Sequence, residues 1–331
     1  MKRRDFLSLF GGAVAAGGAL GGVRPALSQA AKVFRVGTLT VGPPIPPTAG
    51  TGKILVEGLG QRGYTLGQNL AYEARGAAGK VSQTANLMQE LKAANVDVVV
   101  TVSYPAAAAA KASGVPTVIA SGSGDPVKTG LVASLARPGG NVTGISDDAA
   151  ALSTKRLGLL KQLSPQLHKV AMLWNKDDLG MSQRYDASAQ AAQEMGVTVL
   201  PLGVREPDDF NEAFAAMDRS QPDAILMVSD SLTLLNRKRV FDYAAEHRLP
   251  AIYEQDFIAR DGGLMSYGAD QKESFDRAAA LAAKIFQGAK PADLPFELPT
   301  RYLLVVNLKT AKATGINLPA DFVALADEVI E

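Results

Sequence analysis

The 331-residue chain contains no cysteine. This absence excludes disulfide bonds, thiolate catalysis, iron–sulfur clusters and cysteine-based zinc sites. It also excludes a lipid-bearing N-terminal cysteine, so an exported form of the chain would be soluble. Histidine is almost as scarce, since His168 and His247 are the only two, and this weighs against a histidine-based metal site or proton relay. We therefore expect neither a metal nor a cofactor.

A charge excess of either sign is lacking as well. The 34 lysine and arginine residues nearly balance the 33 aspartate and glutamate residues, which gives a formal net charge of +1. No global field would draw the chain to nucleic acid or to an anionic membrane. The composition, with 47% hydrophobic and 20% charged residues, is that of a globular protein, and the length allows two domains.

Sequence motifs for common catalytic sites are also missing. We find no P-loop, no HExxH and no GxSxG, and no nucleophile–base pair is evident, so an enzyme is not expected. Gly58–Gly63 does match GxGxxG, the dinucleotide-binding pattern. That pattern requires a strand before it and a helix after it. Here a helical stretch from Lys53 runs into the glycines, so we interpret them as a helix terminus.

The first 30 residues resemble a targeting peptide. A positive head at residues 2–4 precedes an uncharged, Gly/Ala-rich stretch over 7–22, and small residues at 28 and 30 suit cleavage after Ala30. A membrane anchor is the alternative, but the stretch is short and rich in glycine. The RRxFL pattern resembles a twin-arginine export signal. We therefore expect a periplasmic protein.

From Lys32 onward, short β-rich runs alternate with amphipathic helical stretches, as in parallel sheets covered by helices on both faces. Helical spacing is clear at Leu152, Leu159, Leu160 and Leu163. The expected strands are 33–39, 96–102, 115–120, 142–145, 170–174, 197–202, 224–228, 250–253, 264–267 and 302–306.

These strand–helix units exceed what one compact sheet needs, so we divide them into two lobes. Crossovers between the lobes are expected at 146–148, near 254–256 and near 295–300. The first lobe then comprises 32–146 and 256–296, and the second comprises 147–255 and 297–331. Several crossovers in parallel would act as a hinge that lets the lobes close around a ligand.

Ligands of open α/β sheets bind beyond the carboxyl ends of the strands. In the first lobe, strand 96–102 ends near Thr101 and Ser103, and Pro105 suits the first turn of the following helix. Hydroxyl groups beside free helix N–H groups favour a carboxylate, although Ser103 could instead only cap the helix. Strand 115–120 ends at Ser121 and Gly122, which allow a close approach to a ligand.

In the second lobe, the strand ends place Asn175, Asp230 and Tyr253 at the same edge. Asp230 could pair with a ligand ammonium group in the closed cleft, or it could be a helix cap. Tyr253 and Tyr267 could supply aromatic faces, or they could belong to the core. Asp125, before Pro126, is expected to cap a helix. The complete set of candidate ligand-binding residues is Thr101, Ser103, Ser121, Gly122, Asn175, Asp230, Tyr253 and Tyr267.

Several longer stretches of the sequence carry a family resemblance, namely 124–144, 63–64 with 67–69, 170–175, 262–268 and 307–312. They resemble a family of ABC transporter substrate-binding proteins similar to tryptophan- and tyrosine-binding receptors. The resemblance covers nearly all of 32–331. It implies a type I periplasmic-binding-protein fold, an α/β architecture of two Rossmann-like lobes with parallel sheets joined by a three-strand hinge.

The resemblance also implies a function, namely capture of a small solute and its delivery to the transmembrane subunits of an ABC permease. An amino acid or a small aromatic carboxylate is the expected solute, and a monomer is the expected state. The chain departs from these relatives by lacking the lipid-bearing cysteine and by a Pro-rich insertion over 40–47, which should line the cleft. Two alternatives remain open from sequence: a periplasmic ligand-binding sensor subunit and a Tat-exported oxidoreductase.

Overall fold

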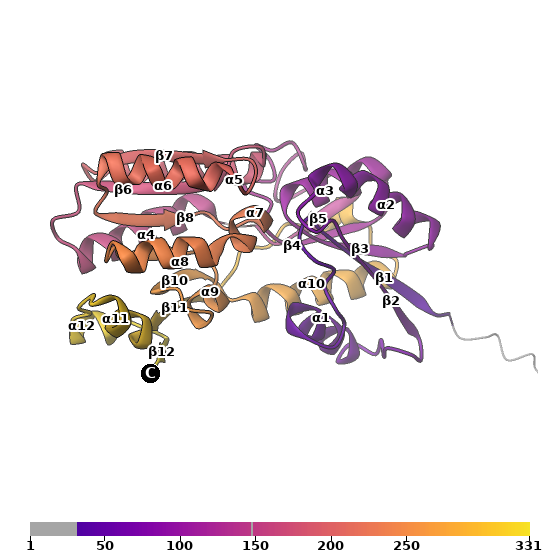
Figure 1. Cartoon of the computed structure of the whole chain (residues 1–331). Coiled ribbons are helices and arrows are strands. Elements are labelled where there is room, and N and C mark those ends of the chain that lie inside the picture. The colour runs from indigo at the N-terminus through magenta and orange to yellow at the C-terminus, as the bar shows by residue number, and fades with distance from the viewer. Residues whose placement is uncertain (1–31, 147) are drawn as a thin grey trace, which may run out of the picture. The chain divides into compact units, whose positions relative to one another are not determined.

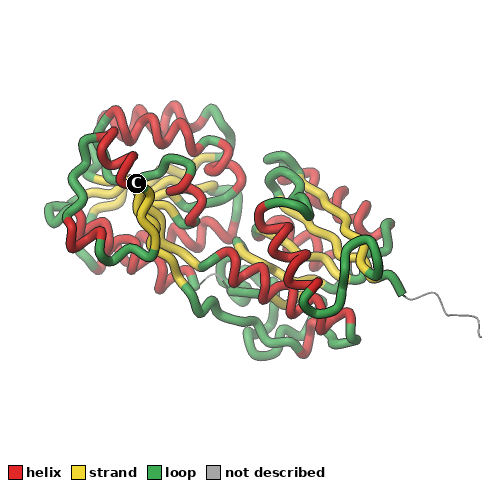
Figure 2. Tube along the Cα trace, turned by 90° about the horizontal axis from the view of Figure 1, so that it is seen from below, coloured by secondary structure: helices red, strands yellow, loops and turns green. Residues whose placement is uncertain are grey.

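The computed structural model describes residues 32–146 and 148–331, so the targeting peptide expected over 1–30 lies outside the described residues. Two separate sheets organise the described chain, one with five strands and one with seven. Figure 1 shows each sheet with its own group of helices, and in Figure 2 helices flank the strands of both. We call each sheet with its helices a lobe.

The first lobe is built on five parallel strands in the order β2-β1-β3-β4-β5. Alternate residues of β3 supply its two cores: Val98 and Val100 pack with helix α10, whereas Val99 packs on the opposite face. This explains why the strand is apolar without alternation. The elements of this lobe are β1 (Phe34–Thr40), α1 (Gly50–Gly60), β2 (Leu70–Gly76), the 3₁₀ turn η1 (Val81–Gln83), α2 (Thr84–Ala93), β3 (Val98–Val102), α3 (Tyr104–Ser113), β4 (Thr117–Ser121), β5 (Val142–Gly144), α10 (Gln271–Phe286) and the 3₁₀ turn η2 (Pro291–Asp293).

The second lobe is built on seven strands in the order β12-β11-β10-β9-β8-β6-β7. Leu159 and Leu160 of α4 are buried against this sheet and Leu163 packs beside them, as their spacing predicts. The elements are α4 (Ala149–Leu163), β6 (Lys169–Asn175), α5 (Leu179–Glu194), β7 (Thr198–Val204), α6 (Asp209–Ser220), β8 (Ala224–Met227), α7 (Ser231–Leu235), α8 (Arg237–Glu246), β9 (Ala251–Tyr253), α9 (Asp256–Arg260), β10 (Met265–Ala269), β11 (Tyr302–Asn307), α11 (Leu308–Thr314), α12 (Ala320–Val323) and β12 (Glu328–Ile330).

The pairing of β10 corrects two expectations. Residues 256–269 were assigned to the first lobe, but Met265 pairs with Ile252 of β9 and with Val306 of β11, both in the second sheet. That assignment is therefore wrong, and the second crossover lies near residue 270. The pairing of β10 with β11 is also antiparallel, so the second sheet is not wholly parallel. The helix expected after Asp125 is a third difference, because residues 126–130 form turns only.

The three crossing segments lie side by side. Glu297 forms a parallel bridge with Ile145, and the N–H of Ser146 donates to the carbonyl oxygen of Glu297 at 2.8 Å. The N–H of Asp270 donates to the carbonyl oxygen of Arg301 at 3.0 Å. Backbone hydrogen bonds thus couple the crossings to each other, as a three-strand hinge requires.

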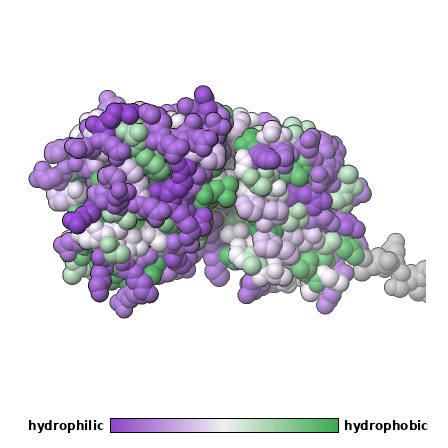
Figure 3. Space-filling view, viewed as in Figure 1, coloured by the Kyte–Doolittle hydropathy of each residue, from purple (hydrophilic) through white to green (hydrophobic). Residues whose placement is uncertain are grey.

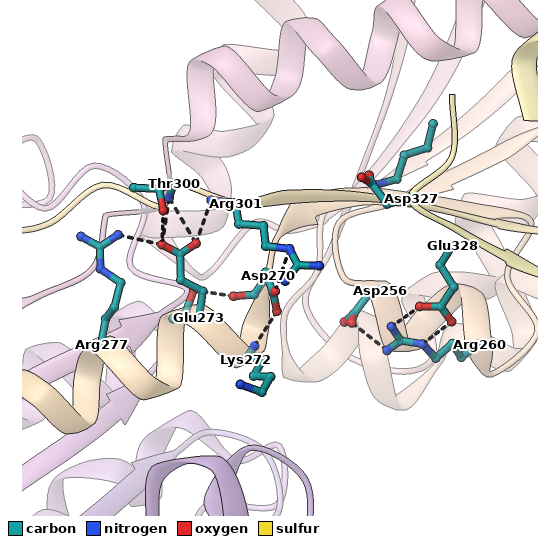
Figure 4. Close-up of polar contacts among 12 residues, drawn as sticks. Asp256, Arg260, Asp270, Lys272, Glu273, Arg277, Thr300, Arg301, Asp327 and Glu328 are labelled. Atoms are coloured by element: carbon teal, nitrogen blue, oxygen red, sulfur yellow. Dashed lines mark hydrogen bonds and ion pairs between the residues drawn. The ribbon is translucent and has the colours of Figure 1, made fainter. Parts of the chain in front are cut away.

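Glu273, at the start of α10, is the polar centre of this hinge (Figure 4). Its carboxylate accepts hydrogen bonds from the N–H and hydroxyl groups of Thr300 and from the N–H of Arg301, and it pairs with Arg277 at 2.9 Å. Arg277 also pairs with Glu297. A helix of the first lobe is thereby fixed to the chain segment that enters β11. Among the described residues, no helix is long and apolar enough to cross a membrane.

Replacing Glu273 by glutamine tests this hinge. Burial raises the pKa of the Glu273 carboxyl, but hydrogen bonds from Thr300, Arg301 and Arg277 outweigh burial and hold the pKa below its usual value of 4.5. The stabilisation is therefore present above that value and is lost as the pH falls through the lowered pKa. Near pH 7, Glu273→Gln should reduce the free energy of unfolding by about 1–3 kcal/mol, measured by urea denaturation.

The loss should shrink below about pH 4.5, as the wild-type carboxyl is protonated. Glu57→Gln is the matched control, because Glu57 belongs to an exposed pair with Lys53 at 3.7 Å, and such pairs contribute little. A Glu273→Gln effect no larger than that of Glu57→Gln at pH 7 would contradict the assignment.

Candidate functional site

A cavity of about 300 Å³ is lined by residues from both lobes, and we call it the interlobe cavity. The space-filling view shows apolar residues exposed where the two lobes meet (Figure 3). The polar lining of this cavity comes mainly from the ends of β1, β3, β4, β8 and β9, as the strand-end rule predicts, and the starts of helices add Thr51, Ser231, Arg237 and Gln271. The lining residues are Thr40, Gly42, Pro43, Ile45, Thr51, Val102, Ser103, Ser121, Gly122, Met181, Ser229, Asp230, Ser231, Leu234, Leu235, Arg237, Gln255, Phe257, Gln271 and Phe275.

Ser103 forms the polar wall of the cavity in the first lobe. It stands before α3 with φ at 85°, a backbone conformation that is uncommon outside glycine. Its hydroxyl caps no helix N–H and has no hydrogen-bond partner, although the residue is only 6% exposed. The capping alternative for Ser103 is therefore not observed. A buried hydroxyl without a partner costs free energy unless a ligand or water satisfies it.

Gly122 allows this wall to form. A Cβ atom on Gly122 would lie 3.0 Å from the backbone nitrogen of Ser103, and its φ is +81°, so glycine is required on both counts. The N–H of Ser103 donates to the carbonyl oxygen of Ser121 at 3.0 Å. Residues 103, 121 and 122 are thus packed into one unit beside the first turn of α3, where N–H groups favour a negatively charged group.

Ser229 and Asp230 form the facing wall in the second lobe. The Ser229 hydroxyl is also buried without a partner, at 4% exposure. The Asp230 carboxylate accepts hydrogen bonds from the N–H and hydroxyl groups of Thr233 at 2.8 and 3.0 Å, in a capping box at the start of α7. Its second oxygen accepts from the side-chain amide of Asn175 at 2.6 Å. The capping role expected as an alternative for Asp230 is therefore real, and Asp230 lines the cavity as well.

A second buried carboxyl group, Asp178, lies near Asp230. It is 2% exposed and caps α5 by accepting from the N–H groups of Gly180 and Met181. Burial and then repulsion from Asp230 raise the pKa of Asp178 to about 7, against the opposing effects of these N–H groups and Arg184. Burial raises the pKa of Asp230 too. Among the described residues, neither carboxyl has a cationic side chain within ion-pair distance, so the pair favours a cationic group.

A buried ion cluster supports the wall that carries Ser229. The Glu254 carboxylate, at the end of β9, binds Arg156 of α4 at 2.9 Å and Arg184 of α5 at 2.5 Å. It also accepts from the N–H of Ser229 at 3.0 Å. Burial raises the pKa of Glu254, but the two arginines and this N–H outweigh burial and lower the pKa overall. The cluster lines a small annex of about 40 Å³, which shares Ser121, Gln255 and Gln271 with the interlobe cavity.

The remaining walls are largely apolar. The Pro-rich segment contributes Pro43 and Ile45, which agrees with its expected place in the cleft. Leu234 and Leu235 of α7 and Phe257 of α9 line the cavity from the second lobe. Polar groups at the strand ends and an apolar remainder are typical of a site for a small amphipathic molecule.

The structure separates the eight candidate residues into two groups. Ser103, Ser121, Gly122 and Asp230 line the cavity. The other four do not line it. Asn175 donates a hydrogen bond to Asp230 without lining the cavity itself, and Thr101 is fully buried with an unpartnered hydroxyl. Tyr253 is 1% exposed and lies in the core beside Phe241. Tyr267 stacks on Tyr302, with ring centroids 6.3 Å apart.

For Tyr253 and Tyr267 the structure shows the core alternative, because neither lines the interlobe cavity and Tyr267 packs against the apolar cluster of the second sheet. Tyr253 belongs to the apolar cluster that includes Phe210 and Ile258, so its ring faces a packed interior. Ser229 lines the cavity and is absent from the candidate set, although it directly precedes Asp230 at the same strand end. Gln255 and Gln271 were missed, although each follows a strand closely and the same strand-end rule could have found them.

Comparisons with known proteins agree with this architecture. The sequence profile of the ABC transporter substrate binding protein family matches residues 49–330. A tyrosine-binding protein of Clostridioides difficile is 26% identical over 271 residues, which are 81% of this chain and 78% of the relative. Both the family match and the match to this relative extend over most of the chain.

Solved structures show the same fold. An ABC domain from Streptococcus pneumoniae in complex with L-Trp has a TM-score of 0.82 at 25% identity, covering 90% of this chain and 100% of the other. A conserved domain protein from Vibrio cholerae has a TM-score of 0.83 at 24% identity, with the same coverage. The fold is that of type I periplasmic binding proteins.

The raised pKa of Asp178 predicts a pH dependence of stability. The folded chain holds this proton up to about pH 7, whereas the unfolded chain releases it near 3.8. The folded state therefore binds more protons between these values, and this group lowers the free energy of unfolding as the pH rises. Asp178→Asn keeps a capping oxygen and removes the titration, so its stability relative to wild type should increase from pH 4 to pH 7 in urea denaturation.

Asp177→Asn provides the control, because Asp177 is an exposed neighbour that pairs with Arg205. A difference between Asp178→Asn and wild type that stays constant over this pH range would show that the Asp178 carboxyl titrates normally.

Proposed function

The chain belongs to the ABC transporter substrate-binding protein family, and we propose that it is the periplasmic receptor of an ABC importer that captures an amino acid or a small aromatic carboxylate. One observation carries the proposal. The interlobe cavity is lined by strand ends of both lobes, and two of its lining residues from opposite lobes, Ser103 and Ser229, have buried hydroxyl groups without a hydrogen-bond partner. A solute between them would satisfy both groups.

The chemistry of the cavity supports the solute class. The first turn of α3 with Ser103, Ser121 and Gly122 suits a carboxylate, and Asp230 backed by Asp178 suits an ammonium group. The apolar walls from the Pro-rich segment, α7 and α9 suit a hydrocarbon or aromatic body. The names of two relatives, which mention tyrosine and L-Trp, point in the same direction.

Binding would be coupled to movement through the hinge. A solute that contacts both lobes has a higher affinity for the closed arrangement than for an open one, so it shifts the population toward closure. The closed receptor then docks on the transmembrane permease subunits and releases the solute. The three paired crossings with Glu273 at their centre provide a hinge of defined geometry for this movement.

A solute screen by thermal denaturation tests the proposed receptor function. L-tyrosine, L-tryptophan and benzoate should be compared, because a solute that binds only the folded chain stabilises it by about 2.7 kcal/mol at one hundred times its Kd. Ser103→Ala and Ser229→Ala should each weaken the stabilisation, whereas Ser134→Ala, at a half-buried loop position outside the cavity, should not. A screen without any shift would refute the proposed solute class.

The role of Asp230 is tested separately by Asp230→Asn, which retains a capping oxygen for α7. If the carboxylate binds a ligand ammonium group, the variant should bind L-tyrosine or L-tryptophan less tightly by roughly 2–5 kcal/mol. Binding of benzoate, which has no ammonium group, should change little. Titration calorimetry measures both, and equal losses for the two kinds of solute would show that Asp230 acts only through α7.

A further inference from the structure

Two glycines from opposite lobes meet beside the interlobe cavity. A Cβ atom on Gly124, in the loop after β4, would lie 2.8 Å from Cα of Gly180, near the start of α5. A Cβ atom on Gly180 would lie 2.9 Å from the carbonyl carbon and oxygen of Ser123 and 3.1 Å from Cβ of Tyr104. The backbones of the two lobes are therefore in direct contact, and no larger residue fits at either position without movement.

A hydrogen bond accompanies this contact. The N–H of Asp125 donates to the side-chain oxygen of Gln183 at 3.1 Å, again from the first lobe to the second. The Asp125 carboxylate accepts from the N–H groups of Val127 and Lys128, which fixes the loop that presents Gly124. Hydrogen bonds within the first lobe therefore fix the shape of this loop. Its contacts with the second lobe are the hydrogen bond from Asp125 to Gln183 and the approach of Gly124 to Gly180.

The contact is adjacent to the solute site. Ser121 and Gly122 of the same loop line the interlobe cavity, and so does Met181, which follows Gly180. Any rotation of the lobes that separated Gly124 from Gly180 would move these lining residues apart as well. The position of this contact therefore sets how tightly the cavity wall can enclose a solute.

We propose that the Gly124–Gly180 contact is the closure contact of this protein, and that solute is retained only when the two backbones meet there. The inference rests on the proposed receptor function. Gly124 and Gly180 are positioning residues, because they touch each other rather than the solute. Their effect on affinity comes from the lobe arrangement that they permit.

Gly180 allows a clean test because its backbone is unstrained. It lies in the first turn of α5, with no positive φ, so alanine at this position favours the helix within the second lobe. The three atoms nearest to its added methyl group all belong to the first lobe. Gly124 has a φ of +68°, so a substitution there would also strain its own loop.

The experiment compares Gly180→Ala with Gly158→Ala. Gly158 is a helical glycine of α4 in the same lobe, and a Cβ atom there would meet nothing within 4 Å. Gly180→Ala should bind L-tyrosine or L-tryptophan about ten- to a hundred-fold more weakly than wild type, because the free energy that overpacking costs corresponds to an affinity change of this size. Gly158→Ala should bind like wild type, and circular dichroism should show that both variants are folded.

Interlobe distances provide a readout that needs no solute. The chain has no cysteine, so spin labels can be attached only at introduced cysteines, for which Gln89→Cys on α2 and Gln193→Cys on α5 are exposed positions. Double electron–electron resonance should reveal a short-distance population in the wild-type background. Gly180→Ala should deplete it, and Gly158→Ala should retain it.

The outcomes separate the two proposals. If neither amino acid binds the wild-type chain but Gly180→Ala still depletes the short-distance population, the proposed solute class fails and the closure contact stands. If Gly180→Ala binds solute and populates the short distance like wild type, the closure contact is refuted. Absence of a short-distance population from the wild-type chain under all of these conditions would also refute it.

Discussion

The carboxylate of Glu254 is the interaction on which the solute site depends most. It joins Arg156 of α4, Arg184 of α5 and the N–H of Ser229 in one buried cluster. Burying three charges is costly, and such a cluster is weak evidence of net stability. Its consequence is geometric. Helices on the second lobe are held in one position relative to the strand end that presents Ser229, so this wall of the cavity is fixed by contacts within its own lobe.

Preorganisation of this kind suits a receptor that must bind tightly with few contacts, because ordering a wall on binding would reduce affinity. The wall in the first lobe is fixed differently. Ser103 is held at a positive φ by its N–H bond to Ser121 and by the close approach of Gly122. Both walls therefore hold an unpartnered hydroxyl in a fixed place, and the adjustable quantity is the distance between the walls. The hinge and the glycine contact act on that distance.

Much of this fold was predictable from the sequence, because continuous Val/Ile runs identify strands covered on both faces. The sheet that a strand joins was less accessible. The apolar pattern of 264–267 is the same whichever lobe it enters, and only the pairing with β9 and β11 decides the matter. Within the site, residues at strand ends were predictable when the backbone itself turns into the cleft, as at Ser103 and Ser121. Tyr253 was not, because one position along a strand reverses the face to which a side chain points.

The Asp230 cluster shows why capping and binding are not exclusive roles. A helix cap needs one carboxylate oxygen, and Thr233 occupies it. The other oxygen receives the amide of Asn175, which leaves the charge buried and only partly balanced, with Asp178 adding to it. Burial and repulsion from Asp230 raise the pKa of Asp178, and a cationic group beside the pair would favour the ionised form of both carboxyls. The same residues that start α5 and α7 therefore give this end of the cavity a preference for positive charge, while the helix N-terminus opposite prefers negative charge. The proposed amino-acid solute, a zwitterion, would satisfy both ends at once, and neither lobe alone provides the pair.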